Sequence, residues 1–489
     1  MRKLEQLVFD NSFARLPETF HHRLCPTRLP DPYLVSFNPV AAALLDLDPA
    51  QAGRADFVEY FIGNQLLPGA EPLAMLYSGH QFGHYVPQLG DGRAILLGEI
   101  RNSTGELWDV QLKGAGPTPF SRNSDGRAVL RSSIREYLCS EAMHGLGIPT
   151  TRALCIVGSD EEVYRESIET AAVLTRLSPS HVRFGSFEVF YYNDQHDALA
   201  VLADYVINRH FPALAKAPDK YVLFLNEVIS RTARLMAQWQ AVGFSHGVMN
   251  TDNMSILGLT FDYGPFGFMD AYDPAYVCNH SDYHGRYAYK QQPQIGHWNL
   301  SCLAQALLPI MPVEAAKAAL ESFMPVYTGY YRDLMGKKLG LTLATADDMA
   351  LINALLELMY AGHVDYTNLF RGLSRFNSAP GEKNALLRDQ FTDRAGFDAW
   401  AETYRARLQH EPGTDVEREA RMNQVNPKYI LRNYLAQNAI ARAGQGRDFS
   451  EVDRLLVLLQ RPFDEQPEME SYAAPPPDWA QDIEVSCSS

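Results

Sequence analysis

The chain has 489 residues, of which 46% are hydrophobic and 21% are charged, the composition of an ordinary globular protein. This length allows two or three domain-sized units or one large two-lobed enzyme. Asp and Glu outnumber Lys and Arg by 58 to 43, which gives a net charge of −15. Such an acidic surface argues against binding nucleic acid or an anionic membrane through bulk electrostatics.

The cysteines and the N-terminal sequence indicate where the protein works. Six cysteines are dispersed along the chain without a C-x-x-C pair, a spacing typical of a reducing compartment and without a zinc site. Residues 1–23 contain no apolar signal core, and no uninterrupted apolar stretch approaches the length of a membrane span. We therefore expect a soluble, cytoplasmic protein.

The first half of the chain predicts strands. Side chains in 106–113 alternate between apolar and polar, the pattern of a strand with one buried face. Apolar residues recur every four positions in 131–147, which predicts a helix that ends at its glycines. We expect further strands at 80–89, 93–100, 151–159 and 170–177, and a loop at 114–127.

The second half predicts helices. We expect them at 197–211, 221–243, 299–309, 315–324 and 348–362, where apolar residues follow helical periodicity. The last fifty residues are Pro-rich and acidic, so we expect a loosely held tail there.

The octet HGVMNTDN, residues 246–253, resembles a protein-kinase catalytic loop with one substitution. That loop reads H-R-D-x-x-x-x-N, in which the Asp takes a hydroxyl proton and the Asn holds a metal ion. His246 and Asn253 match the template, but Val248 stands where the catalytic Asp should be.

Other kinase-like features occur in the expected order. A glycine turn at Gly90 and Gly92 joins two strands, a third strand ends in Lys113, and a helix carries Glu136. A D-F-G-like sequence begins at Asp262, after the octet. In a kinase these parts cover the phosphates, form the Lys–Glu pair and bind metal.

This order predicts an α+β, protein-kinase-like two-lobed fold. We expect five regions: an N-terminal extension packed on the rest (1–74), a strand-rich N-lobe (75–190), a helical C-lobe with the catalytic loop and metal site (191–310), a helical C-terminal extension (311–440) and an acidic Pro-rich tail (441–489).

Each feature also has an ordinary structural explanation. Glycines such as Gly90 often serve hairpin turns alone, and a strand lysine such as Lys113 is usually solvated. Ser133 and Glu136 have the spacing of a capping box, in which the Glu only caps its own helix. The Asp-Asn sequence at 252–253 and Asp262 could be turn residues.

The oxygen-bearing and arginine side chains favour a nucleotide site. Asn253 and Asp262 would supply the hard oxygen ligands that Mg²⁺ or Mn²⁺ prefers. Arginine suits bidentate phosphate binding, and Arg93, Arg176 and Arg183 lie near the expected phosphate-binding elements. Surface ion pairs remain the commoner role for such arginines.

Four longer segments identify a resemblance. YSGHQFGHYVPQLGDGRA (77–94), LKGAGPTPFSRNSDGRAVLRSSIREYL (112–138), HGVMNTDNMSILG (246–258) and FDYGPFGFMDAYDP (261–274) are similar to the selenoprotein O family. The similarity covers at least residues 75–300.

The resemblance implies a kinase-like enzyme that transfers AMP from ATP to Ser, Thr or Tyr hydroxyls of proteins, including its own. It implies that ATP binds in reversed orientation, so that the α-phosphate reacts. The implied ATP-binding residues are Gly90, Gly92, Arg93, Lys113, Asp125, Gly126, Arg176, Arg183 and Asp262. The other implied roles are Glu136 orienting Lys113, Asn253 and Asp262 binding divalent metal, and Asp252 acting as the catalytic base.

The resemblance also draws attention to the end of the chain. Many eukaryotic members carry a selenocysteine close to the C-terminus, where this chain has Cys487. Cys278 lies in the segment that would correspond to a kinase activation segment. A reversible Cys278–Cys487 disulfide is therefore one hypothesis for regulation, and two unrelated thiols are the other.

Two alternative functions stay open from the sequence. The first is a conventional phosphotransferase, although its expected Asp is absent at position 248. The second is a silent nucleotide-binding scaffold, although that role would not require the Lys, Glu, Asn and Asp residues that this chain has.

Overall fold

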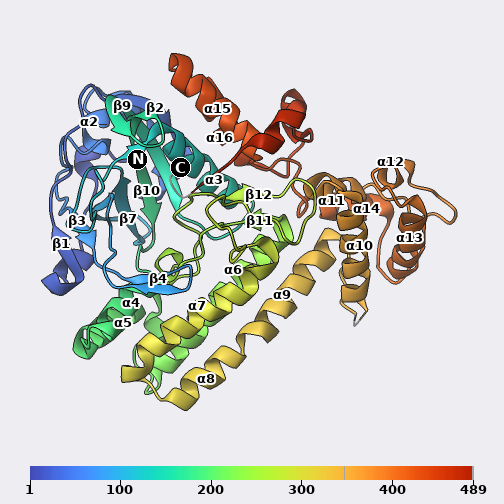
Figure 1. Cartoon of the computed structure of the whole chain (residues 1–489), viewed down its shortest axis with the longest axis horizontal. Helices are drawn as coiled ribbons and strands as arrows, with labels where there is room; N and C mark the ends of the chain where they lie inside the picture. The colour runs from blue at the N-terminus through green and yellow to red at the C-terminus, as the bar shows by residue number, and fades with distance from the viewer. Residues whose placement is uncertain (346, 487–489) are drawn as a thin grey trace.

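The computed structural model describes residues 1–345 and 347–486. A sheet-rich part, at the left of Figure 1, adjoins a part built of long helices. The main sheet comes entirely from residues before 180, and helices dominate after that point. The chain therefore mixes α and β structure in the expected order.

The main sheet has eight antiparallel strands in the order β1-β3-β6-β7-β10-β9-β2, with β8 paired to β10 off this path. Strands β1 and β2 lie within residues 1–74 and β3 begins there, so this region supplies part of the sheet. The strands are β1 (His21–Arg23), β2 (Tyr33–Phe37), β3 (Leu73–Met75), β6 (Ala94–Arg101), β7 (Leu107–Lys113), β8 (Ala128–Val129), β9 (Arg152–Tyr164) and β10 (Ile168–Ser178).

Strand β7 is buried on both faces, whereas the sequence predicts one buried face. Val110 and Leu112 belong to an apolar cluster with Phe57 and Phe61 from the first 74 residues. Lys113, on the polar face, is also buried. That burial excludes the solvated role that a strand lysine usually has.

The helices of the first 362 residues include most of those expected. Helices α3, α5, α6 and α10 confirm their predicted segments to within two residues at either end. The described helices are α1 (Pro39–Ala42), α2 (Phe57–Phe61), α3 (Leu130–Gly145), α4 (Phe184–Tyr192), α5 (His196–His210), α6 (Lys220–Val242), α7 (Gln292–Leu307), α8 (Val313–Glu321), α9 (Phe323–Lys338) and α10 (Asp348–Gly362).

Two predicted segments are wrong. The single helix expected at 315–324 is the end of α8 and the start of α9, with a break at Ser322. The strand expected at 80–89 is a short hairpin of β4 (Gly79–Gln81) and β5 (His84–Val86). Phe82 and Gly83 have φ of 50° and 87°, so the chain reverses there instead of continuing as a strand.

The C-terminal third contains further helices. Most of them form a group at the right of Figure 1, whereas α15 and α16 pack against α3 beside the sheet. These helices are α11 (Tyr366–Leu373), α12 (Ala385–Arg388), α13 (Arg394–Leu408), α14 (Asp415–Asn423), α15 (Asn433–Gly446) and α16 (Ser450–Leu459).

Helix α16 differs from the loosely held tail that the composition suggests. Val452, Leu455, Leu456 and Leu459 recur at helical spacing and are buried against the rest of the chain. One apolar cluster accordingly contains both Phe13 and these α16 residues. The two ends of the chain thus share a core.

Among the described residues, no helix combines the length and apolar character needed to cross a membrane.

Candidate functional site

A cavity of about 490 Å³ lies between the sheet, the 114–127 loop and the 248–265 segment. Its wall contains nine of the twelve residues that the sequence assigns to ATP, metal and catalysis: Gly90, Gly92, Arg93, Lys113, Arg176, Arg183, Asp252, Asn253 and Asp262. The fold therefore gathers residues that are up to 172 positions apart in the sequence. Asp125, Gly126 and Glu136 lie outside the wall.

The glycine turn and the 114–127 loop form one edge of the cavity. The Thr118 hydroxyl donates to the Asp91 carbonyl at 2.7 Å, and the Ser121 hydroxyl donates to the Gly92 carbonyl. The Phe120 ring lies against Gly90, where an added Cβ would come within 2.5 Å of it. Gly90 also has φ of +108°, so a side chain at this position is excluded twice.

Lys113 and Arg176 in the cavity wall form a buried charge cluster with Glu136, which lies outside the wall. One Glu136 oxygen accepts from Lys113 Nζ, and the other accepts from Arg176 Nε at 2.5 Å. Burial lowers the pKa of Lys113 to about 8, although the Glu136 charge opposes this shift. Glu136 therefore holds both cationic side chains in place in the cavity wall.

Glu136 does not cap its helix. Helix α3 begins at Leu130 with Val129 as its N-cap, so Ser133 and Glu136 both lie inside the helix. The capping-box interpretation of this pair is therefore wrong, and the Lys–Glu pair predicted from the order of motifs is present.

Asp262 lies between two arginines. Its Oδ1 is 2.9 Å from Arg176 Nη1, and its Oδ2 accepts from Arg183 Nη1 at 2.5 Å. The two guanidinium groups hold the pKa of Asp262 far below its ordinary value, despite an opposing effect of burial that is the largest single contribution. Asp262 also has φ of +59°, a left-handed conformation that a non-glycine residue seldom adopts.

Arg183 is held on two sides by aromatic rings. Its guanidinium carbon lies 4.5 Å from the ring centroids of Tyr77 and Phe261, within cation–π range. The same group donates to the Asp252 carbonyl at 2.6 Å. Arg183 thus ties the octet to Asp262 and has little freedom to move.

Asp252 is buried and only half satisfied. Gln81 Nε2 donates to Asp252 Oδ2 at 3.1 Å, whereas Oδ1 has no hydrogen-bond partner among the residues that the structure describes. Burial raises the pKa of this carboxyl from 3.8 to about 6. A buried carboxylate with one unpartnered oxygen and a pKa near neutrality suits a general base.

His246, which matches the first residue of the kinase motif, has a structural position. Its Nε2 lies 3.0 Å from the Phe261 carbonyl, and its ring stacks on Trp239. Because a carbonyl only accepts, Nε2 carries the proton. His246 therefore fixes the backbone directly before Asp262.

The donor set in this cavity fits a hard divalent cation. Asn253 and Asp262 both line the wall and offer amide and carboxylate oxygens, and Asp252 Oδ1 is a buried oxygen without a partner. Mg²⁺ and Mn²⁺ prefer such oxygens together with phosphate. Asn253 donates to the Val248 carbonyl through Nδ2 at 3.0 Å, which orients its amide.

A second group of ligand-type atoms lies outside the cavity, at His80, Glu188 and Cys302. Both Glu188 oxygens are already engaged, one by His80 Nδ1 at 2.7 Å and the other by the Thr251 hydroxyl at 2.5 Å. The group is therefore satisfied by hydrogen bonds without a cation.

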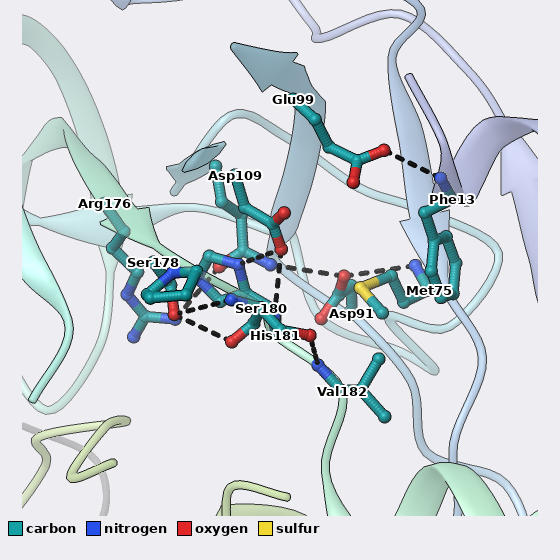
Figure 2. A network of polar contacts seen from close by, with 12 residues as sticks. Phe13, Met75, Asp91, Glu99, Asp109, Arg176, Ser178, Ser180, His181 and Val182 are labelled. Carbon is teal, nitrogen blue, oxygen red and sulfur yellow. Dashed lines mark hydrogen bonds and ion pairs between the residues drawn. The ribbon is translucent and has the colours of Figure 1, made fainter. Parts of the chain in front are cut away.

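Polar contacts behind the cavity connect the sheet to the arginine-bearing segment (Figure 2). Asp91 Oδ2 accepts from the Met75 amide at 3.1 Å, and burial raises the pKa of Asp91 to about 6. Asp109 Oδ2 accepts from the backbone amide of His181 at 2.9 Å and lies 3.1 Å from its Nδ1. The two Asp109 contacts hold the chain between Arg176 and Arg183 in place.

Two of the predicted ATP-binding residues support the loop instead of facing the cavity. Asp125 forms an ion pair with Arg165, with oxygen–nitrogen distances of 2.7 and 2.9 Å. Gly126 packs on Gly116, whose carbonyl carbon would be 2.2 Å from an added Cβ. Their direct contact with nucleotide stays a prediction.

Comparison with known proteins decides the family. Residues 3–460 match the family model described as "Protein adenylyltransferase SelO". Proteins named "Protein nucleotidyltransferase YdiU" from Thiobacillus denitrificans, Myxococcus xanthus and Thioalkalivibrio sulfidiphilus are 62%, 59% and 60% identical to it, and each match covers 100% of both chains.

The chain belongs to the SelO family.

Membership confirms the resemblance seen in the four sequence segments and identifies this SelO-family chain as a nucleotidyltransferase. ATP as substrate follows from adenylyl transfer, and the oxygen-rich wall of the cavity is consistent with a divalent metal ion. The silent-scaffold alternative is therefore wrong.

Sequence reasoning missed several residues in the wall of this SelO-family site, notably Tyr77, Gln81, Phe82 and Asn250. The segment YSGHQFG contains three of them, and it contributed only to the strand predicted at 80–89 and to the family resemblance. Nothing in their spacing indicates that the hairpin lies on the octet.

Proposed function

We propose that this protein transfers AMP from ATP to hydroxyl groups of protein Ser, Thr and Tyr residues, using the 490 Å³ cavity. The observation that carries the proposal is Asp252, a buried carboxylate that lines the same wall as Lys113, Arg176 and Arg183. A base and a cationic phosphate site thus face one space. A kinase-like fold with reversed ATP is part of the proposal and is supported by the order of these motifs.

The reaction that suits this arrangement is an in-line displacement at the α-phosphorus. The hydroxyl oxygen forms a bond to that phosphorus, the bond to the bridging oxygen breaks, and pyrophosphate leaves with the electron pair. The Asp252 carboxylate accepts the hydroxyl proton. Lys113, Arg176 and Arg183 neutralise charge on the phosphates, which is the main requirement of such transfers.

A divalent ion bound to Asn253 and Asp262 would supply further charge neutralisation at the phosphates. Both Asp262 oxygens are engaged by Arg176 and Arg183 in this structure, so a metal ion would share this carboxylate with the two arginines or take their place.

Val248 argues against a conventional phosphotransferase. It occupies the wall position that a kinase uses for its base, and it cannot accept a proton. Asp252, four residues later, is the carboxylate available in the octet. We infer that the attacking hydroxyl therefore approaches a different phosphorus from the one attacked in kinases.

The experiment that tests this proposal uses ATP labelled separately at the α- and γ-phosphates, with purified protein and Mg²⁺ or Mn²⁺. We expect metal-dependent incorporation of the α label alone, into the protein itself and into an acceptor protein, and none in Asp262→Ala. Incorporation of the γ label would instead identify a phosphotransferase.

We also propose that a Cys278–Cys487 disulfide regulates access to this site. Cys487 lies outside the described residues. The Val485 carbonyl accepts a backbone hydrogen bond from His280 at 2.8 Å, so the end of the described chain lies beside His280, which is two residues after Cys278 in the sequence. Cys278 is buried, its Sγ donates to the Pro265 carbonyl at 2.8 Å, and burial raises its pKa to about 12. The Cys278 segment must therefore open before the thiol reacts.

Disulfide formation transfers two electrons from the thiols to an oxidant such as hydrogen peroxide and releases two protons. We expect peroxide to change AMP transfer reversibly in the wild type and to leave Cys487→Ala unaffected. An equal response in both proteins would exclude the pair.

A further inference from the structure

A short turn of the chain, residues 279–287, is anchored at both ends on the octet. Asn279 Nδ2 donates to the Gly247 carbonyl at 3.0 Å, and the Tyr287 hydroxyl donates to Asn250 Oδ1 at 2.6 Å. Asn279 and Tyr287 are each buried. The turn therefore starts and ends at the segment that forms one wall of the cavity.

The β4–β5 hairpin packs on the end of this turn. The Phe82 amide donates to the Tyr287 hydroxyl at 3.0 Å, and the two rings lie with centroids 5.1 Å apart. The guanidinium group of Arg286 lies against Gly83 and over the Trp298 ring, 4.7 Å from its centroid. Because Phe82 is partly exposed and lines the cavity, the turn adjoins an accessible part of the cavity wall.

A buried carboxylate fixes the tip of the turn. Asp282 is buried, and its two oxygens accept from the Arg286 and Tyr287 amides at 3.0 and 2.7 Å. Its carbonyl accepts from the Gly285 amide at 3.1 Å. Hydrogen bonds to a carboxylate are stronger than those between neutral groups, so the next residue, Tyr283, is carried by a firmly held backbone.

Tyr283 is the exposed residue at this tip. Its side chain is 82% exposed, more than that of any other tyrosine that the structure describes. Its ring lies near the His280 ring, with centroids 6.3 Å apart, and its hydroxyl has no hydrogen-bond partner among the described residues. A large ring in water forgoes the free energy of burial, so this tyrosine is placed to be buried against another molecule.

We propose that Tyr283 accepts AMP when two copies of this chain meet, so that the hydroxyl of one copy reacts in the cavity of the other. This inference rests on the proposed function and names one of the protein hydroxyls that the site modifies. The Tyr283 oxygen forms a bond to the α-phosphorus of the ATP held by the second copy, and pyrophosphate leaves with the electron pair of the broken bond. The hydroxyl proton passes to the Asp252 carboxylate of that second copy, and the product is a phosphodiester on tyrosine.

Two observations indicate reaction between copies rather than within one. Tyr283 is absent from the wall of its own cavity, as far as the described residues define it. Both ends of its turn are bonded to the octet, so entry into that cavity would break the Asn279 and Tyr287 contacts. Two copies related by a two-fold axis present the same face to each other. A tip that adjoins one cavity then lies beside the cavity of the other copy.

The test uses two full-length chains with tags of different length, the wild type as enzyme and Asp262→Ala as acceptor. They are incubated with α-labelled ATP and Mg²⁺ or Mn²⁺ and separated on a gel, and the labelled residue of the acceptor is found by peptide mass spectrometry. The acceptor also carries Tyr283→Phe or, as the matched control, Tyr360→Phe, because Tyr360 is a 49% exposed tyrosine on α10. Self-labelling of the wild type is measured over a range of protein concentrations.

We expect AMP on Tyr283 of the Asp262→Ala chain, at least about a fivefold loss of label with Tyr283→Phe and no loss with Tyr360→Phe. The rate of self-labelling per molecule should rise in proportion to protein concentration. As enzyme, Tyr283→Phe should label the acceptor within about twofold of the wild-type rate, because the substitution keeps the ring.

Label that persists in the Tyr283→Phe acceptor, or that maps to other residues, would overturn the inference. Label confined to the wild-type chain would also overturn it, because the reaction would then occur within one copy. Absence of the α label from the wild type itself would contradict the proposed function, whereas normal incorporation away from Tyr283 would contradict only the choice of acceptor.

Discussion

Glu136 is the residue on which the cationic side of the cavity depends. Each of its oxygens binds a different cation, Lys113 or Arg176, and its side chain is almost completely buried. Among the described residues, the other carboxylate that pairs with Arg176 is Asp262, which Arg183 also binds. The geometry of phosphate binding therefore depends on one carboxylate.

We predict that Glu136→Gln lowers kcat/KM for ATP by at least about tenfold, because removing a buried charge partner releases both cations. Steady-state AMP transfer and ATP binding by calorimetry measure this loss. Glu169→Gln is the control, since Glu169 pairs with Arg131 outside the cavity wall. Equal effects of the two substitutions would contradict the assignment.

The pH dependence of activity follows from two groups in the wall. Asp252, with a pKa of about 6, must lose its proton to act as a base, so activity should rise as the pH passes 6. Lys113, with a pKa of about 8, must stay charged to bind phosphate, so activity should fall as the pH passes 8. We predict a bell-shaped kcat/KM profile. In Lys113→Arg the alkaline limb should disappear, because a guanidinium stays charged.

The buried charge of Asp252 should also lower the stability of the folded protein. Its pKa is raised from 3.8 in the unfolded chain to about 6, so folding penalises the charged form. The penalty is absent below about pH 3.8 and complete above about pH 6. We predict that Asp252→Asn raises the melting temperature by about 1–3 °C at pH 7.5 while abolishing AMP transfer. A smaller rise at pH 5 would support the electrostatic cause, and a fall at pH 7.5 would exclude it.

For individual residues, the sequence predicted which ones lie in the site better than it predicted which ones contact each other. Lys113 and Asp262 follow from motif order, because strand and D-F-G positions are local signals. Gln81 does not, because its position in the wall accompanies a contact with Asp252, 171 positions away. No periodicity reports such a contact.

The 114–127 loop is the element that most constrains the cavity edge. Gly126 has φ of +67°, and the backbone of Gly116 lies where its side chain would be. Gly147 has a similar φ of +74° with open space around it. A comparison of substitutions at Gly126 and Gly147 therefore separates the effect of close packing from the effect of backbone strain.

We predict that Gly126→Ala lowers AMP transfer by at least about tenfold and raises KM for ATP, because the loop must move away from the glycine turn. Gly147→Ala should carry a comparable backbone strain of about 1 kcal/mol with activity retained. The comparison uses KM for ATP and melting temperature. Retained activity in Gly126→Ala would show that the loop tolerates displacement.

Element prediction succeeded where the pattern is long. Helix α6, with 23 residues and a clear apolar face, was predicted almost to its ends. The β4–β5 hairpin was not, because three-residue strands give too short a period and the turn uses Phe82, a residue that seldom adopts positive φ. The α8–α9 break also escaped prediction, because Ser322 is compatible with either state.

At the scale of the whole molecule, the sheet-rich part depends on sequence from both ends. Strands β1 and β2 come from the first 40 residues, and α16 packs against α3 and β2. Asp453 on α16 also accepts from the Ser36 hydroxyl at 2.6 Å. The composition of the last fifty residues concealed this role, since the six apolar residues of α16 lie among many Pro and acidic residues.

We predict that Leu455→Ala lowers the free energy of unfolding by about 2–5 kcal/mol, because Leu455 is fully buried in the shared core. Val457→Ala in the same helix is the control, since Val457 is 51% exposed and should change stability by less than about 0.5 kcal/mol. Urea unfolding followed by circular dichroism measures both. Similar midpoints would show that α16 is peripheral.

Because α16 shares a core with Phe13 and packs against α3, the nucleotide cavity is expected to form only after α16 has been synthesised. A ribosome makes the glycine turn, Lys113 and the octet long before it makes residues 450–459. Until those residues emerge, α3 lacks one of its packing partners, and Glu136, which α3 carries, lacks a fixed place. The active cleft is therefore expected to mature late, after nearly the whole chain has left the ribosome, and incomplete chains should depend on chaperones.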